Sequence, residues 1–319
     1  MRLRLRAHNQ SLEPNGYHTK THRAPYCGAQ SWPYNASDEL ERGNDCVMEI
    51  KGKVAVITGA ASGIGRAAAV ELCKHGVAAL ALVDISEAVH EVATELNAVH
   101  GSRVARAFCG DTTDATFRHE VFETMRHAHG PINICVPAAG ITRDALAVKI
   151  NKDKGKANLY PIEHFRLVVE VNLIAPVYWA LEMVAQLAED RFVRGLKQWS
   201  PDEGSQGVVV FIGSVSSQGN KGQISYAATK VGLEGAASTL TKEAMYYGVR
   251  CAVLHPGFTD TPMVRALGED YIQTQVLPAT QIKRLIRPEE IADAISFLIR
   301  NSAVSGQLWA DAGWHPMPT

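Results

Sequence analysis

The chain has 319 residues, with 32 Lys and Arg against 33 Asp and Glu, and a net charge of −1. This balance excludes the basic surface of a nucleic-acid-binding or membrane-surface protein, and no apolar run approaches the ~20 residues of a membrane span. The six cysteines are scattered without a CxxC pair, which predicts reduced thiols in a cytoplasmic protein. No group of potential ligands has the spacing of a metal site, so no metal is expected.

The first 47 residues are polar, rich in Arg, His, Asn, Tyr and Pro, and without helical or strand periodicity. Arginines alternate with leucines at the start, as in a transit peptide, but the apolar core of a secretory signal is lacking. Residues 1–47 are therefore predicted to be a disordered extension, or to reflect the choice of start codon, since Met48 comes immediately before residues 49–53, a natural approach to the first strand. The folded domain is predicted to cover residues 48–319.

From Lys53 onward, short β-branched runs alternate with amphipathic helical stretches. The predicted strands are 53–58, 79–84, 103–109, 132–136, 208–213, 250–254 and 307–310, and the predicted helices are 63–75, 86–100, 114–128, 161–192, 225–247 and 288–300. Strands separated by helices imply parallel pairing, and strands that are apolar throughout suit a sheet covered on both faces. The prediction is one Rossmann-type, doubly wound α/β sheet that binds its ligands beyond the carboxyl ends of the strands.

A glycine-rich loop joins the first strand to the first helix. Gly59, Gly63 and Gly65 permit a tight turn and let backbone amides approach a pyrophosphate. The start of the helix adds free amides and a partial positive charge. Ser62 and Ile64 complete this predicted phosphate site, for which an ordinary turn is the alternative interpretation.

The second strand ends in a carboxylate, Asp84. In this fold such a carboxylate can accept both hydroxyls of the adenine ribose, and it would repel a 2′-phosphate. Ile85 follows it, and the glycine loop holds Ser62 rather than an arginine, so no cation is placed to favour NADP. The sequence therefore predicts NAD as cofactor, although a plain carboxylate at the strand end is the alternative.

Tyr226 and Lys230 are four residues apart in a predicted helix, which puts the phenol and the ammonium on one face. A free tyrosine, with a pKa near ~10, is a poor base. A neighbouring Lys⁺ and the charge of an oxidised nicotinamide would favour the phenolate, which could then remove the proton of an alcohol. Alone, this pair is more often an ordinary surface feature, and its neighbouring motifs decide the interpretation.

Two further segments accompany the pair. Ser214 lies in a hydroxyl-rich run, IGSVSS, after the fifth strand, and the segment PGFTDTP follows the sixth strand. With the loop TGAASGIG, these motifs resemble the short-chain dehydrogenase/reductase family in order and spacing, over about residues 50–315. The candidate residues of the second segment are Pro256, Gly257, Thr259 and Thr261.

The resemblance implies the catalytic roles. Ser214 would hydrogen-bond the substrate oxygen, with Ser216 as the alternative because the interval from Ser214 to Tyr226 is slightly short for the family. Asn172 matches an asparagine that breaks a helix and holds a water leading from the lysine to solvent. Lys230 would also bind the hydroxyls of the nicotinamide ribose.

The resemblance also implies the remaining cofactor contacts. Thr259 and Thr261 match the segment that contacts the nicotinamide amide and the phosphates, and Asp111 matches the acidic residue near the adenine. The family often has Asn-Asn-Ala-Gly after the fourth strand, whereas this chain has Pro-Ala-Ala-Gly. Ala139 and Gly140 still permit close approach to the cofactor, but the missing amides put hydrogen bonding at the sheet edge in question.

The expected substrate is a small-molecule secondary alcohol or ketone: a hydroxyacyl, steroid-like or other medium-sized apolar compound. The segment GITRD looks like that of 3-oxoacyl-acyl-carrier-protein reductases, and related 17β-hydroxysteroid dehydrogenases also remain possible. One alternative is such a reductase using NADPH, and others are a non-catalytic NAD-binding protein and a lyase or epimerase. A homotetramer or homodimer is expected. Residues 260–287 are the expected lid, whose apolar side chains either face a substrate or simply pack on the domain. The charged stretches 149–159 and 190–207 are interpreted as solvated loops, with a dock for an acidic carrier or a subunit contact as the alternative.

Overall fold

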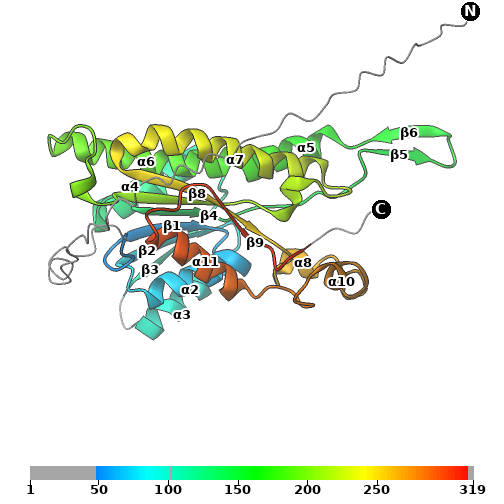
Figure 1. The fold of residues 1–319 in the computed structure, drawn as a ribbon, viewed down its shortest axis with the longest axis horizontal. Helices are drawn as coiled ribbons and strands as arrows, with labels where there is room; N and C mark the ends of the chain where they lie inside the picture. The colour runs from blue at the N-terminus through cyan, green and yellow to red at the C-terminus, as the bar shows by residue number, and fades with distance from the viewer. Residues whose placement is uncertain (1–47, 101–102, 315–319) are drawn as a thin grey trace, which may run out of the picture. The chain divides into compact units, whose positions relative to one another are not determined.

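The computed structural model describes residues 48–100 and 103–314, so the predicted extension 1–47 lies outside the described residues (Figure 1). Seven parallel strands form one sheet in the order β3-β2-β1-β4-β7-β8-β9. The strands are β1 (Val54–Thr58), β2 (Ala79–Asp84), β3 (Ala105–Cys109), β4 (Ile134–Pro137), β7 (Gly207–Ile212), β8 (Val249–Pro256) and β9 (Gln307–Ala310). The predicted doubly wound Rossmann-type sheet is confirmed.

Helices cover both faces of this sheet (Figure 1). On one face lie α2 (Gly63–Lys74), α3 (Val89–His100) and α11 (Pro288–Arg300), and on the other lie α4 (Ala115–His129), α6 (Ala175–Val193) and α7 (Ile224–Ala244). Every residue of β1, β7 and β8 is buried, as the continuous apolar runs require for a sheet covered on both sides.

The predicted break near Asn172 is a π-helical turn, Glu170–Ile174, between α5 (Ile162–Val169) and α6. By length and apolar composition alone, this helical segment, Ile162–Val193, is the one described segment that could cross a membrane. In this fold α6 instead buries Trp179 completely beneath the sheet. Such π turns recur at functional sites.

Two charged stretches are more ordered than expected. Residues 149–159 form most of an antiparallel hairpin, β5 (Val148–Asn151) and β6 (Lys156–Leu159). In the stretch 190–207, α6 continues to Val193, and the 3₁₀ turn Pro201–Glu203 brings Glu203 to Arg191 at 2.6 Å. The interpretation as a solvated loop is wrong for Arg191, which is 2% exposed, because this carboxylate neutralises it.

The segment after β8 contains the expected lid. It comprises α8 (Pro262–Arg265), α9 (Glu269–Tyr271), the π turn Ile272–Val276 and α10 (Leu277–Ala279). Ile272 and Val276 pack with Leu285 in a small separate core, whereas Met263 and Leu267 stay exposed at the carboxyl edge of the sheet. Both interpretations of this segment are therefore partly correct, because some side chains pack on the domain and others remain available to a substrate. Short 3₁₀ turns cover Val215–Gln218 and Met245–Tyr247.

Candidate active site

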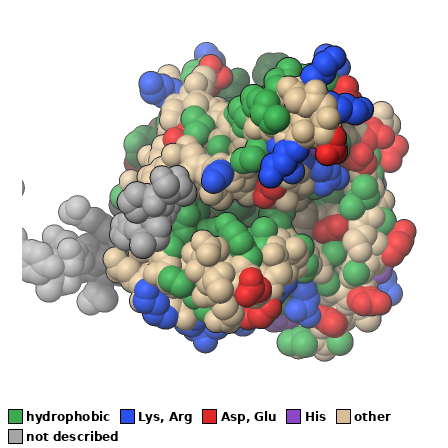
Figure 2. All heavy atoms as spheres, turned by 90° about the vertical axis from the view of Figure 1, so that its right-hand side faces the viewer, with side chains coloured by type: hydrophobic (Ala, Val, Ile, Leu, Met, Phe, Trp, Pro, Cys, Tyr) green, Lys and Arg blue, Asp and Glu red, His purple; other side chains and the backbone are tan. Residues whose placement is uncertain are grey.

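A cavity of about 450 Å³ opens beyond the carboxyl ends of the strands, where β1 and β4 lie side by side and the chain order of the sheet reverses. Figure 2 looks onto this face and shows it hollowed, with hydrophobic side chains along the hollow. The predicted residues that line the cavity are Gly59, Ser62, Gly63, Ile64, Gly65, Asp84, Ile85, Asp111, Ala139, Gly140, Tyr226, Lys230 and Thr261.

The glycine loop fits a dinucleotide because it leaves space and unpaired donors. A Cβ on Gly59 would lie 2.8 Å from the backbone nitrogen of Ala139, and one on Gly65 would lie 2.2 Å from the oxygen of Gly59. Ser62 precedes α2 without a side-chain hydrogen bond to it, so the first amides of the helix remain available to an anion. Close packing and free amides are what a pyrophosphate site needs.

Asp84 lines the larger cavity where β2 and β3 end, together with Ile85 and Asp111. Its two carboxylate oxygens accept hydrogen bonds from the backbone N–H groups of Ala61 and Ser86, both at 3.0 Å. These bonds fix the carboxylate, and each oxygen keeps a lone pair for a ribose hydroxyl.

The segment after β4, where this chain has Pro-Ala-Ala-Gly, is held at the sheet edge by hydrogen bonds to Thr58 of β1. The hydroxyl of Thr58 accepts a hydrogen bond from the backbone N–H of Ala139 at 3.1 Å, and the carbonyl of Thr58 accepts one from the N–H of Ala138 at 3.2 Å. The Pro-Ala-Ala-Gly segment is therefore anchored on β1 without the two amide side chains that the family often has.

Asn172 is fully buried in the π turn. Its oxygen accepts from the N–H of Ile141 at 2.9 Å, and its nitrogen donates to the carbonyl of Ile141 at 2.8 Å. A Cβ on Gly140 would lie 3.4 Å from Asn172 Oδ1 and 4.0 Å from Lys230 Nζ. The fold thus brings Asn172 close to Lys230, and Asn172 holds the loop after β4.

Tyr226 and Lys230 lie one turn apart on α7, with the ammonium 5.4 Å from the centre of the phenol ring. Burial raises the pKa of Tyr226 to about 12, and the hydrogen bond with Ser214 opposes this shift. Burial also lowers the pKa of Lys230 to about 8, and its Nζ donates to the carbonyl of Ile212 at 2.7 Å. Desolvation is the largest cause of the shift at Tyr226, and a lowering of this pKa by Lys230 together with an oxidised nicotinamide stays a prediction.

The two candidate serines differ in what their hydroxyls contact. Ser214 lines the same small cavity as Tyr226 and lowers its pKa, and its Oγ accepts from the N–H of Ser216 at 3.1 Å, which leaves the proton of Ser214 free to donate. Ser216 instead donates to Gln223 Oε1 at 2.8 Å. Ser214 is therefore the serine placed beside the phenol.

A second cavity of about 120 Å³ adjoins Ser214 and Tyr226. Pro256, Gly257 and Thr259 line this cavity rather than the larger one, whereas Thr261 lines both. Thr259 Oγ1 donates to the carbonyl of Gly257 at 3.1 Å. The predicted threonine segment thus lines the smaller cavity and, at Thr261, also the larger one.

Some residues at this site were not predicted. Arg143 lines the larger cavity, and Asp144 and Asn220 line the smaller one. Tyr160 donates to the carbonyl of Arg143 at 2.6 Å and lies 2.9 Å from the hydroxyl of Ser225. Their positions depend on loop geometry, for which the sequence carries no periodic signal. His255, a polar residue in an apolar strand, was a signal that could have been noticed.

A glycine loop at the switch point and a Ser-Tyr-Lys group on one edge define a class of protein, the nicotinamide-dependent α/β oxidoreductases. Residues 53–272 match the short chain dehydrogenase family. The chain belongs to this family, as the sequence motifs predict.

The chain is similar to curated proteins along most of its length. It is 30% identical over 257 residues to the 3-oxoacyl-[acyl-carrier-protein] reductase FabG of Escherichia coli, covering 80% of this chain and 93% of that protein. It is 33% identical to the FabG of Thermotoga maritima, covering 82% and 96%. It is 30% identical to a (3R)-3-hydroxyacyl-CoA dehydrogenase of Canis lupus familiaris, covering 79% and 90%.

Proposed function

We propose that this short chain dehydrogenase transfers hydride between NAD and a secondary alcohol or ketone of medium size and apolar character. The observation that carries the proposal is the meeting of Ser214, Tyr226 and Lys230 where a cofactor-sized cavity adjoins a smaller apolar one. When bound, a nicotinamide dinucleotide supplies the hydride acceptor or donor. The chain's own residues supply binding, orientation and the proton.

Each member of the group has a distinct role in this proposal. Ser214 donates a hydrogen bond to the substrate oxygen and stabilises the charge that develops there. Tyr226 takes the hydroxyl proton of an alcohol, or returns a proton to a ketone oxygen. Lys230 binds ribose hydroxyls, and Asn172 holds the loop beside it and supports the proton path to solvent.

The NAD preference rests on charge at the adenine end of the cavity. Asp84 and Asp111 line the cavity there, and its two cationic lining residues, Arg143 and Lys230, belong to the loop after β4 and to α7. A 2′-phosphate would face two carboxylates, which raises the free energy of NADP binding. The alternative is a 3-oxoacyl-acyl-carrier-protein reductase using NADPH, in line with the names of the relatives. A second alternative is a non-catalytic NAD-binding protein on the same fold.

Two further proposals concern assembly and location. Apolar side chains on α5, α6 and α7 are exposed, among them Leu167, Tyr178 and Val231 at 41%, 50% and 46%. Such a surface favours pairing with a second copy, as a homodimer or homotetramer. A cytoplasmic location agrees with the free thiols of Cys73 and Cys135 among the described residues.

A coupled fluorescence assay tests the proposal. Protein starting at Met48 is incubated with NAD and a panel of 3-hydroxyacyl thioesters, hydroxysteroids and aliphatic secondary alcohols, and NADH formation is recorded. The matched reactions use NADP and, in reverse, ketones with NADH or NADPH. Turnover that is faster with NAD supports the proposal, and turnover with NADPH alone supports the reductase alternative. NADH binding without turnover across the panel would contradict enzymatic function.

A further inference from the structure

His255 is a fully buried histidine in β8, directly beneath the strand end that carries Ser214. The β7–β8 ladder ends with Ile212 opposite Leu254, followed by a bond from the N–H of Gly213 to the carbonyl of Leu254 at 2.7 Å. Beyond that point, the backbone of Ser214 has left the ladder. The Nδ1 atom of His255 lies 3.3 Å from the nitrogen of Ser214 and 3.2 Å from its oxygen.

The other ring nitrogen faces a carboxylate without hydrogen-bonding to it. Nε2 of His255 lies 3.7 Å from Oε1 of Glu234 on α7, and Gln307 donates to the other oxygen of Glu234 at 3.1 Å. Burial lowers the pKa of His255, which keeps the ring neutral, and the charge of the carboxylate favours the tautomer protonated on Nε2. In that tautomer Nδ1 accepts from the N–H of Ser214, and in the other it donates to the carbonyl of Ser214, so Nδ1 holds the Ser214 backbone in both.

The ring is held from several sides. Trp309 of β9 stacks on it, with ring centres 4.1 Å apart and planes at 11°. On the side of β7, a Cβ on Gly213 would lie 2.5 Å from Nδ1, so only glycine leaves space for the imidazole. Contacts from β7, β9 and α7 therefore fix the acceptor atom in one place.

We infer that His255 is a positioning residue, which accepts the Ser214 N–H through Nδ1 and thereby holds the Ser214 hydroxyl in line with Tyr226. The inference rests on the proposed function, because it concerns the orientation of the proposed oxyanion donor. Ser214 Oγ already accepts from Ser216 N–H, so the two bonds together determine the backbone and the rotamer. Without the Nδ1 acceptor, the N–H of Ser214 loses its hydrogen-bond partner at the point where the β7–β8 ladder has ended.

Three substitutions of His255 separate the effect of the Nδ1 acceptor from the effect of the ring's volume. Asparagine places an oxygen where Nδ1 lies, glutamine places its polar atoms near Nε2, and leucine retains bulk without an acceptor. We expect His255→Leu and His255→Gln to lower kcat by about 10-fold to 100-fold, since a misplacement of about 1 Å can have that effect. His255→Asn should stay within about fivefold of wild type, and KM for NADH should change by less than about twofold in all three.

The readouts are steady-state kinetics with the best substrate of the panel, together with melting temperatures and an exposed control, His90→Leu, that should match wild type. A purely structural role would lower the melting temperatures and kcat of the asparagine and glutamine variants alike, and this result would overturn the inference. If the leucine variant does not fold, the asparagine-to-glutamine ratio of kcat decides alone. An inactive wild-type protein would instead count against the proposed function, so the two failures are distinguishable.

Discussion

Two buried cations lie at opposite ends of the parallel strands, called here the carboxyl edge and the amino edge of the sheet. They differ in how many of their hydrogen-bond donors the protein uses. At the carboxyl edge, Lys230 is 5% exposed, donates one hydrogen bond, to the carbonyl of Ile212, and has a lowered pKa. At the amino edge, Arg250 is 4% exposed, and its guanidinium donates to carbonyls at the end of α11 and in the turn after it, among them Ile299 at 2.7 Å and Val304 at 3.0 Å. Lys230 keeps donors in reserve, whereas both terminal nitrogens of Arg250 are engaged and only its Nε lacks a partner.

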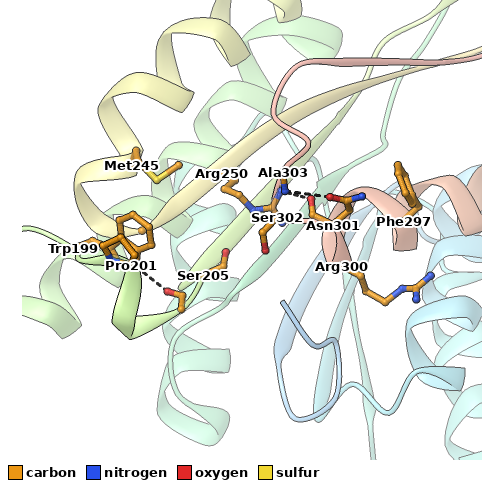
Figure 3. Close-up of a pocket in the computed structure, with 12 residues that line it drawn as sticks. Trp199, Pro201, Ser205, Met245, Arg250, Phe297, Arg300, Asn301, Ser302 and Ala303 are labelled. Carbon is orange, nitrogen blue, oxygen red and sulfur yellow. Dashed lines mark hydrogen bonds between the residues drawn. The ribbon is translucent and has the colours of Figure 1, made fainter. Parts of the chain in front are cut away.

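The cavities at the two edges of the sheet show the same difference in unused hydrogen-bonding groups. The largest one, of about 710 Å³, lies at the amino edge and is lined by Arg250, Trp199 and Phe297 (Figure 3). Two of its large polar side chains are engaged within the protein: besides the terminal nitrogens of Arg250, the indole N–H of Trp199 donates to the carbonyl of Gly204 at 2.8 Å. The smaller cavities at the carboxyl edge keep free helix amides and the Ser214 hydroxyl. Unused hydrogen-bonding capacity, rather than volume, marks the candidate site.

The largest expected effect comes from removing the proton-transferring group at the carboxyl edge. Tyr226→Phe should lower kcat by about 10²-fold to 10⁴-fold, the range of general acid–base catalysis. The affinity for NADH should stay within about twofold, because the phenol is not part of the phosphate site. Stopped-flow turnover and fluorescence titration measure the two quantities. Retained turnover would show that another group transfers the proton.

The pH dependence of kcat/KM should differ between the two directions of the reaction. Burial raises the pKa of Tyr226 to about 12, so the phenolate is scarce at neutral pH and the phenol abundant. Between pH 6 and 8, kcat/KM for alcohol oxidation should rise by up to about tenfold per unit, whereas that for ketone reduction should change little. A flat oxidation profile, measured in buffers of constant ionic strength, would exclude Tyr226 as the titrating base.

At the amino edge, the expected effect is on stability and not on turnover. Arg250→Met leaves the last carbonyls of α11 without donors and should lower the free energy of unfolding by roughly 2–4 kcal/mol. Turnover at 25 °C should stay within about twofold. Arg300→Met, at an exposed arginine of the same cavity, is the matched control and should change stability by less than about 0.5 kcal/mol. Urea unfolding measures both, and equal effects would remove the contrast between the edges.

The smallest effect on turnover concerns cofactor choice. Asp84→Ser keeps an acceptor for the N–H of Ala61 but removes the charge near the ribose. The ratio of kcat/KM for NADP to that for NAD should rise about tenfold, which corresponds to about 1.4 kcal/mol. An unchanged ratio in the two assays would refute the role of Asp84 in discrimination.

Many of the strands and helices were predictable because the spacing of apolar residues along the chain reflects which side chains are buried. The bounds of β2, β9 and α11 agree with the prediction, and the break near Asn172 is where the π turn lies. The hairpin was missed because lysines alternate with Val148 and Ile150, so an alternating strand resembles a charge run. Partners brought together only by the fold, such as Glu203 for Arg191, leave no local signal.

For the site, sequence motifs located the glycine loop and the Tyr226–Lys230 pair, since both depend on short, fixed spacing. The balance of pKa shifts could not be predicted, because desolvation depends on how deeply α7 packs. The same holds for His255, whose place beneath Ser214 follows from strand register between β7 and β8.

The carboxyl edge of the sheet holds the Lys230 cation at the expense of stability. Lowering the pKa of Lys230 from 10.5 to about 8 costs the fold roughly 3 kcal/mol at neutral pH, at about 1.4 kcal/mol per pH unit. The unfolded chain binds the proton more tightly, so this penalty is complete below pH 8 and disappears as the pH rises to 10.5.

The most direct measurement is therefore the unfolding free energy of Lys230→Met against wild type at pH 7 and pH 10. After allowance for the lost bond to Ile212, the variant should be more stable by roughly 1–2 kcal/mol at pH 7. That gain should shrink toward zero at pH 10, and the variant should have no measurable turnover at pH 7. A variant that is less stable than wild type at pH 7, as expected for Arg250→Met, would contradict the claim.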